Sequence, residues 1–209
     1  LGEVLRVHPF DQPDVEASKL ETKKLTTAYE EQGGLPAEPV LFEQDGLRLY
    51  ADATNAAALD RAVGPGRSLE AYLRAHFARA KPGDYGAFLA YLPMTSANEA
   101  ILGGLQNRLR DAKRIAVCVG FGPRFLHSTG QAYKGGPDTG VFLQITSDDA
   151  VDLPVPGRRY TFGVVKAAQA RGDLAVLSER GRRALRVHLP AHVARGLDRL
   201  SKALEAALR

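Results

Sequence analysis

The sequence predicts an α/β fold, a three-layer α/β/α sandwich around a mostly parallel sheet. From Ser68 onward, segments with the pattern of a helix alternate with segments with the pattern of a strand, which is typical of parallel sheets covered on both faces. The run KRIAVCVGFG at 113–122 is apolar almost throughout, as in strands buried on both sides. With 209 residues and 44% hydrophobic content, the chain is long enough to bury such a core.

The first elements of the chain are predicted to be a strand and a helix. Residues 4–7 have the apolar pattern of a short strand. A helix is expected from Val15 to about Gln32, because Pro13 and Asp14 favour a helix start and two glycines at 33–34 favour a stop.

A β-hairpin and a connection are expected next. EPVLFEQDGLRLYAD at 38–52 alternates polar and apolar residues around Asp45-Gly46, a dipeptide that favours tight hairpin turns. Residues 53–68 look like a connection whose alanine-rich half could form a short helix. We therefore expect residues 1–67 to be the end of a preceding domain and residues 68–209 to be a separate carboxy-terminal domain.

The second part alternates helix and strand to the end of the chain, and Ser68 is expected to cap its first helix. Helices are expected at 68–80, 96–112, 161–181 and 191–209, with another starting within 125–133, and strands at 84–93, 113–122, 140–146 and 183–189. The tetrapeptide LRVH occurs at 5–8 and again at 185–188, a weak indication of an internal repeat. Ligands of such sheets bind beyond the carboxyl ends of the strands.

Charge and composition narrow the function classes. The net charge is +4, but the basic residues are interspersed with acidic ones and lack interleaved aromatics, which disfavours nucleic-acid binding and suits an anionic metabolite or an acidic protein surface. No 18-residue apolar run is present, so no membrane span is expected. Cys118 is the only cysteine and lies in the apolar run IAVCV, which predicts a buried thiol and suits a cytoplasmic protein.

The first motif that could carry chemistry is PFDQPDVEASK at 9–19. Gln12 lies just ahead of the expected helix, where free backbone N–H groups attract anions. Glu16 and Lys19 are three residues apart and therefore share one face of that helix. The alternative is a capped helix with an ordinary surface Glu–Lys pair.

The second motif is VGFGPRFLHSTGQAYKGGPDTG at 119–140. A strand ends in a glycine-rich turn, and four polar residues follow where the next helix should begin: His127, Ser128, Thr129 and Gln131. These residue types suit sugar hydroxyls or a phosphate, and the alternative is a polar helix cap over the edge of the sheet.

Several other chemistries are disfavoured. The Gly-x-Gly at 120–122 lacks the third glycine of a dinucleotide-binding fingerprint. His127 and Ser128 are chain neighbours and no G-x-S-x-G motif exists, which argues against a serine hydrolase. The five histidines have no metal-ligand spacing, so we expect no metal site.

PFDQPDVEASK, together with FLHSTGQAYKGGP and YTFG, resembles glucose-6-phosphate isomerases. The whole chain is most similar to the carboxy-terminal portion of the bifunctional transaldolase/glucose-6-phosphate isomerases. The resemblance implies a sugar-isomerase (SIS-like) fold for residues 68–209 and an activity that interconverts glucose 6-phosphate and fructose 6-phosphate. It also implies no cofactor, a larger parent chain that could include an upstream transaldolase domain, and a homo-oligomer.

The resemblance also implies roles for individual residues. Gln12 matches the family's active-site glutamine, and Lys19 matches the lysine that helps to open the sugar ring. His127 resembles the histidine that protonates the ring oxygen, with Ser128, Thr129 and Gln131 beside it as substrate contacts. Isomerisation needs an acid to open the ring and a base to move a proton between C2 and C1 through an enediol.

The chain departs from the family in two respects. The histidine motif precedes the Gln-to-Lys motif in ordinary isomerases, but here it follows it. The family's glutamate base, in a segment like E-S-x-G-K, and its Ser/Thr-rich phosphate loop are absent. We therefore expect the chain to carry the ring-opening half of the site and to be inactive or nearly so alone. The alternatives are a sugar-phosphate-binding or assembly domain without a catalytic group and, third, a nucleic-acid-binding module.

Overall fold

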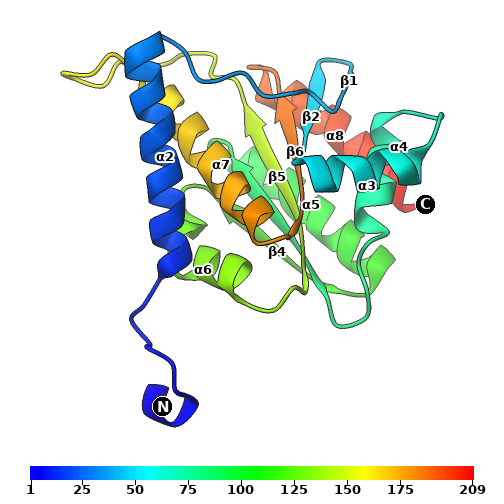
Figure 1. Ribbon diagram of the computed structural model, residues 1–209. Coiled ribbons are helices and arrows are strands. Elements are labelled where there is room, and N and C mark those ends of the chain that lie inside the picture. Colours follow the sequence, from blue (N-terminus) through cyan, green and yellow to red (C-terminus); the bar gives the residue numbers. More distant parts are fainter.

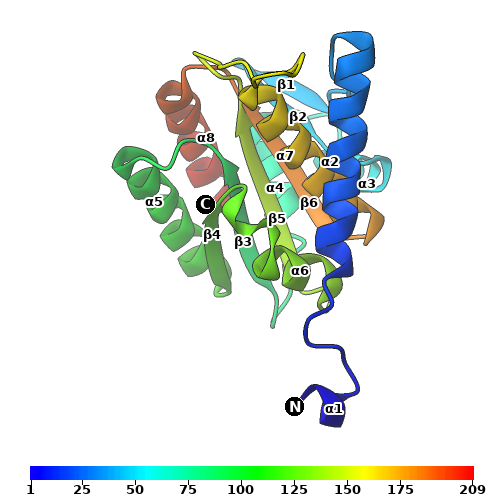
Figure 2. The same ribbon diagram turned by 90° about the vertical axis from the view of Figure 1, so that its left-hand side faces the viewer.

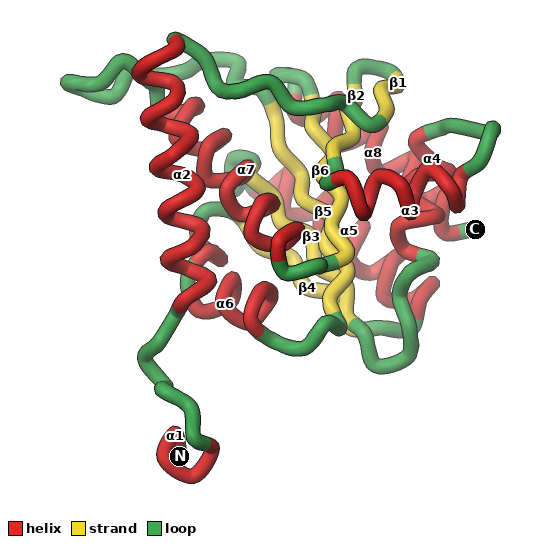
Figure 3. Tube along the Cα trace, viewed as in Figure 1, coloured by secondary structure: helices red, strands yellow, loops and turns green.

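A six-stranded, mostly parallel sheet with helices on both faces forms the centre of the molecule. It is seen in a computed structural model that describes all 209 residues (Figures 1 and 3). The strand order is β1-β2-β6-β5-β3-β4. The strands are β1 (Phe42–Gln44), β2 (Leu47–Tyr50), β3 (Tyr85–Tyr91), β4 (Ala116–Phe121), β5 (Gly140–Ser147) and β6 (Arg183–Leu189). The α/β class and the mostly parallel sheet are therefore as the sequence predicts.

The helices are α1 (Gly2–Leu5), α2 (Pro13–Gln32), α3 (Ala53–Val63), α4 (Leu69–Phe77), α5 (Ser96–Lys113), α6 (Ser128–Gly135), α7 (Phe162–Glu179) and α8 (Val193–Leu208), with a 3₁₀ turn η1 at Arg124–Leu126. Predicted capping is confirmed where it is local: the Ser68 hydroxyl accepts the Ala71 N–H at the start of α4. The alanine-rich part of the predicted connection is helical as α3, because the Asp52 carboxylate caps it by accepting the Thr54 and Asn55 N–H groups.

Two hydrophobic cores lie on opposite faces of the sheet. The larger core joins the sheet to α3, α4, α5 and α8, with α8 packed against both α4 and α5. The smaller core joins the other face to α6 and α7. In Figure 2, α2 runs alongside α7 on the outer side of that layer, and helix α5 stands on the far side of the sheet.

The amino-terminal segment corrects the sequence prediction. Residues 4–7 are not a strand: Gly2–Leu5 form a one-turn helix, and Arg6 ends it in the left-handed conformation. The segment extends away from the rest of the fold (Figures 1 and 2), and its apolar side chains are exposed. A strand needs a partner for its backbone groups, and none is offered here, so local helical bonds satisfy them instead. The LRVH copy at 5–8 therefore shares no structure with the copy at 185–188 in β6.

Residues 13–67 pack onto the second part of the chain. The predicted hairpin is confirmed, with Asp45 and Gly46 both at positive φ in its turn, and β2 pairs antiparallel with β6 within the same sheet. Helix α3 packs on α4, and α2 packs along α7. Packing is thus continuous across residue 67, while the origin of residues 1–67 in a preceding domain stays a prediction.

Strand β4 lies at the edge of the sheet, which changes the interpretation of its apolar run. Its only strand neighbour is β3, to which it is parallel. Cys118 is exposed and not buried as predicted. Its neighbour Val117 belongs to the larger core, but β4 contributes no residue to the smaller core on the opposite face, where Cys118 lies. None of the helices is both long enough and apolar enough to cross a membrane.

Candidate functional site

The two motifs singled out in the sequence meet at one cavity. Lys19 from α2 and His127 from the turn after η1 both line a cavity of about 470 Å³, here called the helix-side cavity. Its other lining residues are Val15, Ser18, Thr22, Lys23, Thr26, Pro123, Arg124, Leu126 and Gln169. The volume is within the range of small-molecule sites in proteins.

The charges of this cavity are of one sign. Lys19, Lys23 and Arg124 line it together with His127, and no carboxylate does. Lys19 is exposed and makes only a weak surface ion pair with Glu16, with 3.4 Å between Nζ and Oε2. Its ammonium is therefore available to a ligand, and the cavity suits an anionic one.

The position of α2 is fixed by a contact between its first turn and α6. The Asp14 N–H donates to Gln131 Oε1 at 2.9 Å, and the Gln131 side-chain amide donates back to Asp14 Oδ2 at 2.7 Å. Arg180, at the end of α7, donates to the other carboxylate oxygen of Asp14 at 2.7 Å. Gln131 thereby satisfies a free N–H at the start of α2 and links α2 to α6.

A glycine allows α2 to approach α7 closely. A Cβ on Gly172 would lie 3.0 Å from Thr22 Oγ1 and 3.1 Å from the Ser18 carbonyl oxygen. Ser18 and Thr22 bind their hydroxyls to carbonyls within α2, at Asp14 and Ser18 respectively, so the face that meets Gly172 is small and has its polar groups satisfied. This crossing holds Lys19 on the side of α2 that borders the cavity.

The other predicted site residues lie outside the helix-side cavity. Gln12 is exposed, precedes α2 and makes no side-chain capping bond. Ser128 and Thr129 are exposed in the first turn of α6 and do not line the cavity. Gln131 is bound to Asp14 as described above. The structure thus brings together Lys19 and His127 but not Gln12, Ser128, Thr129 or Gln131.

The glycines before His127 serve packing. A Cβ on Gly120 would lie 2.9 Å from the Phe125 ring, and one on Gly122 would lie 2.7 Å from the Tyr91 ring. These close approaches account for the Gly-x-Gly pattern without a ligand. No group of three or more His, Cys, Asp or Glu side chains is placed to hold a metal ion.

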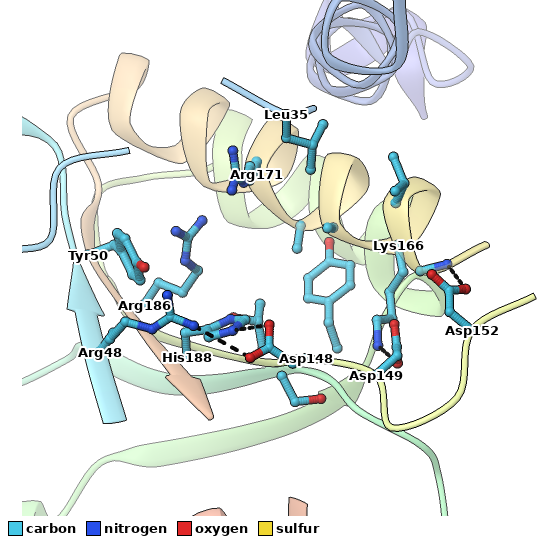
Figure 4. Close-up of a pocket in the computed structure, with 17 residues that line it drawn as sticks. Leu35, Arg48, Tyr50, Asp148, Asp149, Asp152, Lys166, Arg171, Arg186 and His188 are labelled. Carbon is cyan, nitrogen blue, oxygen red and sulfur yellow. Dashed lines mark hydrogen bonds and ion pairs between the residues drawn. The ribbon is translucent and has the colours of Figure 1, made fainter. Parts of the chain in front are cut away.

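A second cavity, which neither of the two polar motifs borders, lies at the carboxyl ends of the central parallel strands. It has a volume of about 390 Å³ and is called the strand-end cavity (Figure 4). Its lining residues are Leu35, Arg48, Tyr50, Tyr91, Thr146, Ser147, Asp148, Asp149, Asp152, Gly163, Val164, Lys166, Ala167, Ala170, Arg171, Arg186 and His188. The general rule for ligand position in such sheets could have located this cavity, but only with the strand order known.

Comparisons with known proteins support the fold alone. No model of a known family matches the chain, and no characterised protein matches it in sequence. Among solved structures, it is similar to hypothetical protein TT0462 from Thermus thermophilus, with a TM-score of 0.60 and 16% sequence identity. The match covers 76% of this chain but 44% of the other, so this chain corresponds to less than half of the length of that protein. The chain therefore shares an α/β architecture with that protein.

Proposed function

We propose that this chain is part of an isomerase that interconverts glucose 6-phosphate and fructose 6-phosphate, and that it supplies the groups that open the sugar ring. The observation that carries the proposal is that Lys19 and His127, 108 positions apart in the sequence, line one cavity. Of the six residues that the family resemblance points to, these two line the cavity, and each comes from a different one of the two motifs.

The chemistry of the helix-side cavity suits a hexose phosphate. Lys19, Lys23 and Arg124 offer positive charge to a phosphate or to an enediolate oxygen. A protonated His127 can donate its proton to the ring oxygen as the bond between C1 and that oxygen breaks, and a solvent water can take the proton of the C1 hydroxyl, which opens the ring to the free aldehyde.

The second half of the reaction needs a group that this cavity lacks. Moving the proton from C2 to C1 requires a base, and no carboxylate lines the helix-side cavity. In this proposal the base comes from the remainder of the parent protein or from a partner copy. The isolated chain then binds the substrate and turns it over slowly or not at all.

The absence of a carboxylate also favours the alternative, a sugar-phosphate-binding or assembly domain that contributes cations but no catalytic group. The two proposals differ in the complete parent protein. If Lys19 and His127 open the ring, Lys19→Met and His127→Asn lower turnover by about 100-fold or more while the fold is retained. If the domain only binds or assembles, turnover stays within a few fold.

Both proposals assume that the helix-side cavity binds a sugar phosphate, and a binding measurement on this chain tests that assumption. Calorimetric titration with fructose 6-phosphate should give binding that Lys19→Met and His127→Asn each weaken. Lys24→Met is the matched control, because Lys24 is exposed on the same helix, pairs with Glu21 and does not line the cavity. Equal affinity in all three variants, or no binding by the parent chain, would remove the helix-side cavity from the proposal. Turnover by the isolated chain at the rate of a complete isomerase would refute its assignment as a half-site.

A further inference from the structure

The strand-end cavity contains buried polar atoms without a protein partner. Ser147 and Arg186 both line it, and they are 7% and 3% exposed respectively. Ser147 Oγ and Arg186 Nε make no hydrogen bond with the protein. A buried donor without a partner costs roughly 1–3 kcal/mol, so the wall of this cavity contains polar groups that the protein itself leaves unsatisfied.

Three guanidinium groups gather on the β2–β6 side of this cavity. Arg48, Arg171 and Arg186 come from β2, α7 and β6, and Figure 4 shows them with Tyr50 on that side. The Arg186 guanidinium lies over the Tyr50 ring, 4.2 Å from its centroid. Burial lowers the pKa of Arg171, although Glu38 opposes this, which shows that its cation is poorly solvated.

Carboxylates compensate only part of this charge. Glu38 accepts from Arg171 at 2.6 Å and from Arg186 at 2.8 Å through the same oxygen, Oε2. Asp148 lies 3.5 Å from an Arg48 nitrogen and also accepts from His188. On this side of the cavity, two carboxylates therefore face three guanidinium groups. On the other side, Asp149 and Asp152 accompany a single cation, Lys166, so the cavity is positive at the arginine end and negative at the opposite end. The anionic group of a ligand would be favoured at the arginine end.

The other side of the cavity offers acceptors and hydroxyls. Asp149 pairs with Lys166, and Asp152 accepts the Gly163 N–H at 2.8 Å, so a side chain of the protein already occupies the start of α7. His188 is held between Thr146 Oγ1 and Asp148, at 2.9 Å from each. If the His188 Nε2–H donates to Asp148, then Nδ1 accepts from the Thr146 hydroxyl. Burial lowers the pKa of His188, which favours this neutral form.

We infer that the strand-end cavity binds an anionic polyol about the size of a hexose phosphate or an aldonate. The anionic group lies among Arg48, Arg171 and Arg186, and the hydroxyls meet Ser147 and Asp148. The site is separate from the helix-side cavity: the two share no lining residue, and α7 gives Gln169 to one and Ala167, Ala170 and Arg171 to the other. The inference therefore does not depend on the proposed isomerase function.

The test is an NMR titration of the ¹⁵N-labelled chain with glucose 6-phosphate, gluconate, inorganic phosphate and glucose. The first two carry both parts of the inferred ligand, and the last two carry one part each. The amide signals of Ser147 and Gly163 should shift when glucose 6-phosphate or gluconate is added. The ligand that binds more tightly shows whether the cavity prefers a phosphate or a carboxylate. Inorganic phosphate and glucose should each bind at least about 10-fold more weakly than the tighter anionic polyol, or not bind detectably.

Variants assign the shifts to this cavity. Ser147→Ala removes a hydroxyl that has no protein partner, and Arg48→Met removes a half-exposed cation, so both should fold. Each should weaken binding by about 10- to 100-fold. Lys19→Met should leave these shifts unchanged, since Lys19 lines only the helix-side cavity. Absence of shifts at Ser147 and Gly163 with either anionic polyol would overturn the inference. So would equal affinity for glucose or phosphate, or unchanged affinity in both strand-end variants.

Discussion

Gln131 and Asp14 bind each other through two hydrogen bonds, although 117 positions separate them in the sequence. The bond that Gln131 accepts comes from a backbone N–H at the start of α2, where a capping side chain would ordinarily act. Gln12 precedes this helix but does not cap it. The residue assigned to substrate contact by resemblance thus caps a distant helix, α2, which forms one wall of the helix-side cavity.

Replacing Gln131 with alanine should loosen α2. The change leaves the buried Asp14 carboxylate and N–H each without one partner, which costs about 1–3 kcal/mol. Urea unfolding should show the loss of stability, and amide hydrogen exchange should speed up in the first turns of α2. Ser128→Ala, an exposed position in the first turn of the same helix α6, should change neither measurement. Parent-like exchange of α2 in Gln131→Ala would contradict this role.

The crossing of α2 and α7 makes a second prediction. A Cβ at Gly172 meets Thr22 and Ser18 of α2 at 3.0 to 3.1 Å, so Gly172→Val should displace α2 and lower stability. Gly104→Ala in α5 is the contrasting substitution, because nothing lies within 4 Å of a Cβ there. Removing a glycine from an open position within a helix should raise stability by roughly 0.5–1 kcal/mol. Thermal or urea unfolding of both variants checks the opposite signs. A Gly172→Val chain as stable as the parent would show that the approach is not tight.

Local signals in the sequence predicted most of the elements. Ser68 caps α4, and Asp45-Gly46 forms the hairpin turn, because caps and tight turns are decided by a few neighbouring residues. Sequence patterns whose outcome depends on a distant part of the chain gave wrong predictions. Residues 4–7 have a strand pattern but no strand to pair with, and Cys118 is in an apolar run that becomes an edge strand.

The candidate sites divide in the same way. Lys19 and His127 could be chosen from their motifs, and only the fold shows that they border one cavity. Arg48, Arg186 and His188 of the strand-end cavity alternate with core residues along β2 and β6, as ordinary strand residues do. Their grouping follows from the antiparallel register that places Arg48 opposite His188 and Tyr50 opposite Arg186. Nothing in the one-dimensional pattern records that register.

The buried histidine His76 predicts a pH dependence of stability. Burial, with the nearby charge of Arg79, lowers the pKa of His76 to about 3, from an ordinary value of 6.5. The unfolded chain therefore binds a proton at this residue below about pH 6.5 that the folded chain refuses. The free energy of unfolding should be unaffected above that pH and should fall by up to about 1.4 kcal/mol per unit as the pH drops toward 3.

His76→Gln isolates this contribution. A glutamine amide is neutral at every pH and can still donate to the Phe142 carbonyl, which the His76 ring contacts at 3.0 Å. Urea unfolding between about pH 7 and pH 4.5 should give a flatter pH dependence for the variant than for the parent. His8→Gln, in the exposed amino-terminal segment, serves as the control and should keep the parent's slope. Identical slopes for His76→Gln and the parent would show that another group controls acid stability.

The ion pair between Lys134 and Asp173 makes the last prediction. Both side chains are almost fully buried, and burial raises the pKa of Asp173 while the Lys134 ammonium opposes the rise. The pair therefore survives because each charge compensates the other. Lys134→Met leaves a buried carboxylate without its counter-ion and should lower the free energy of unfolding by about 3–5 kcal/mol.

A double variant separates the destabilisation caused by an unpaired buried carboxylate from the net contribution of the ion pair to stability. Lys134→Met with Asp173→Leu removes both charges, and apolar replacements of buried pairs are often neutral or stabilising. The double variant should therefore be more stable than Lys134→Met alone, as measured by urea unfolding. Lys202→Met breaks an exposed pair with Asp198 and should change stability by less than about 1 kcal/mol. The single variant Asp173→Leu completes the comparison. If the double variant loses as much stability as Lys134→Met and Asp173→Leu together, Lys134 and Asp173 contribute independently, and the pair is not the unit that stabilises this side of the sheet.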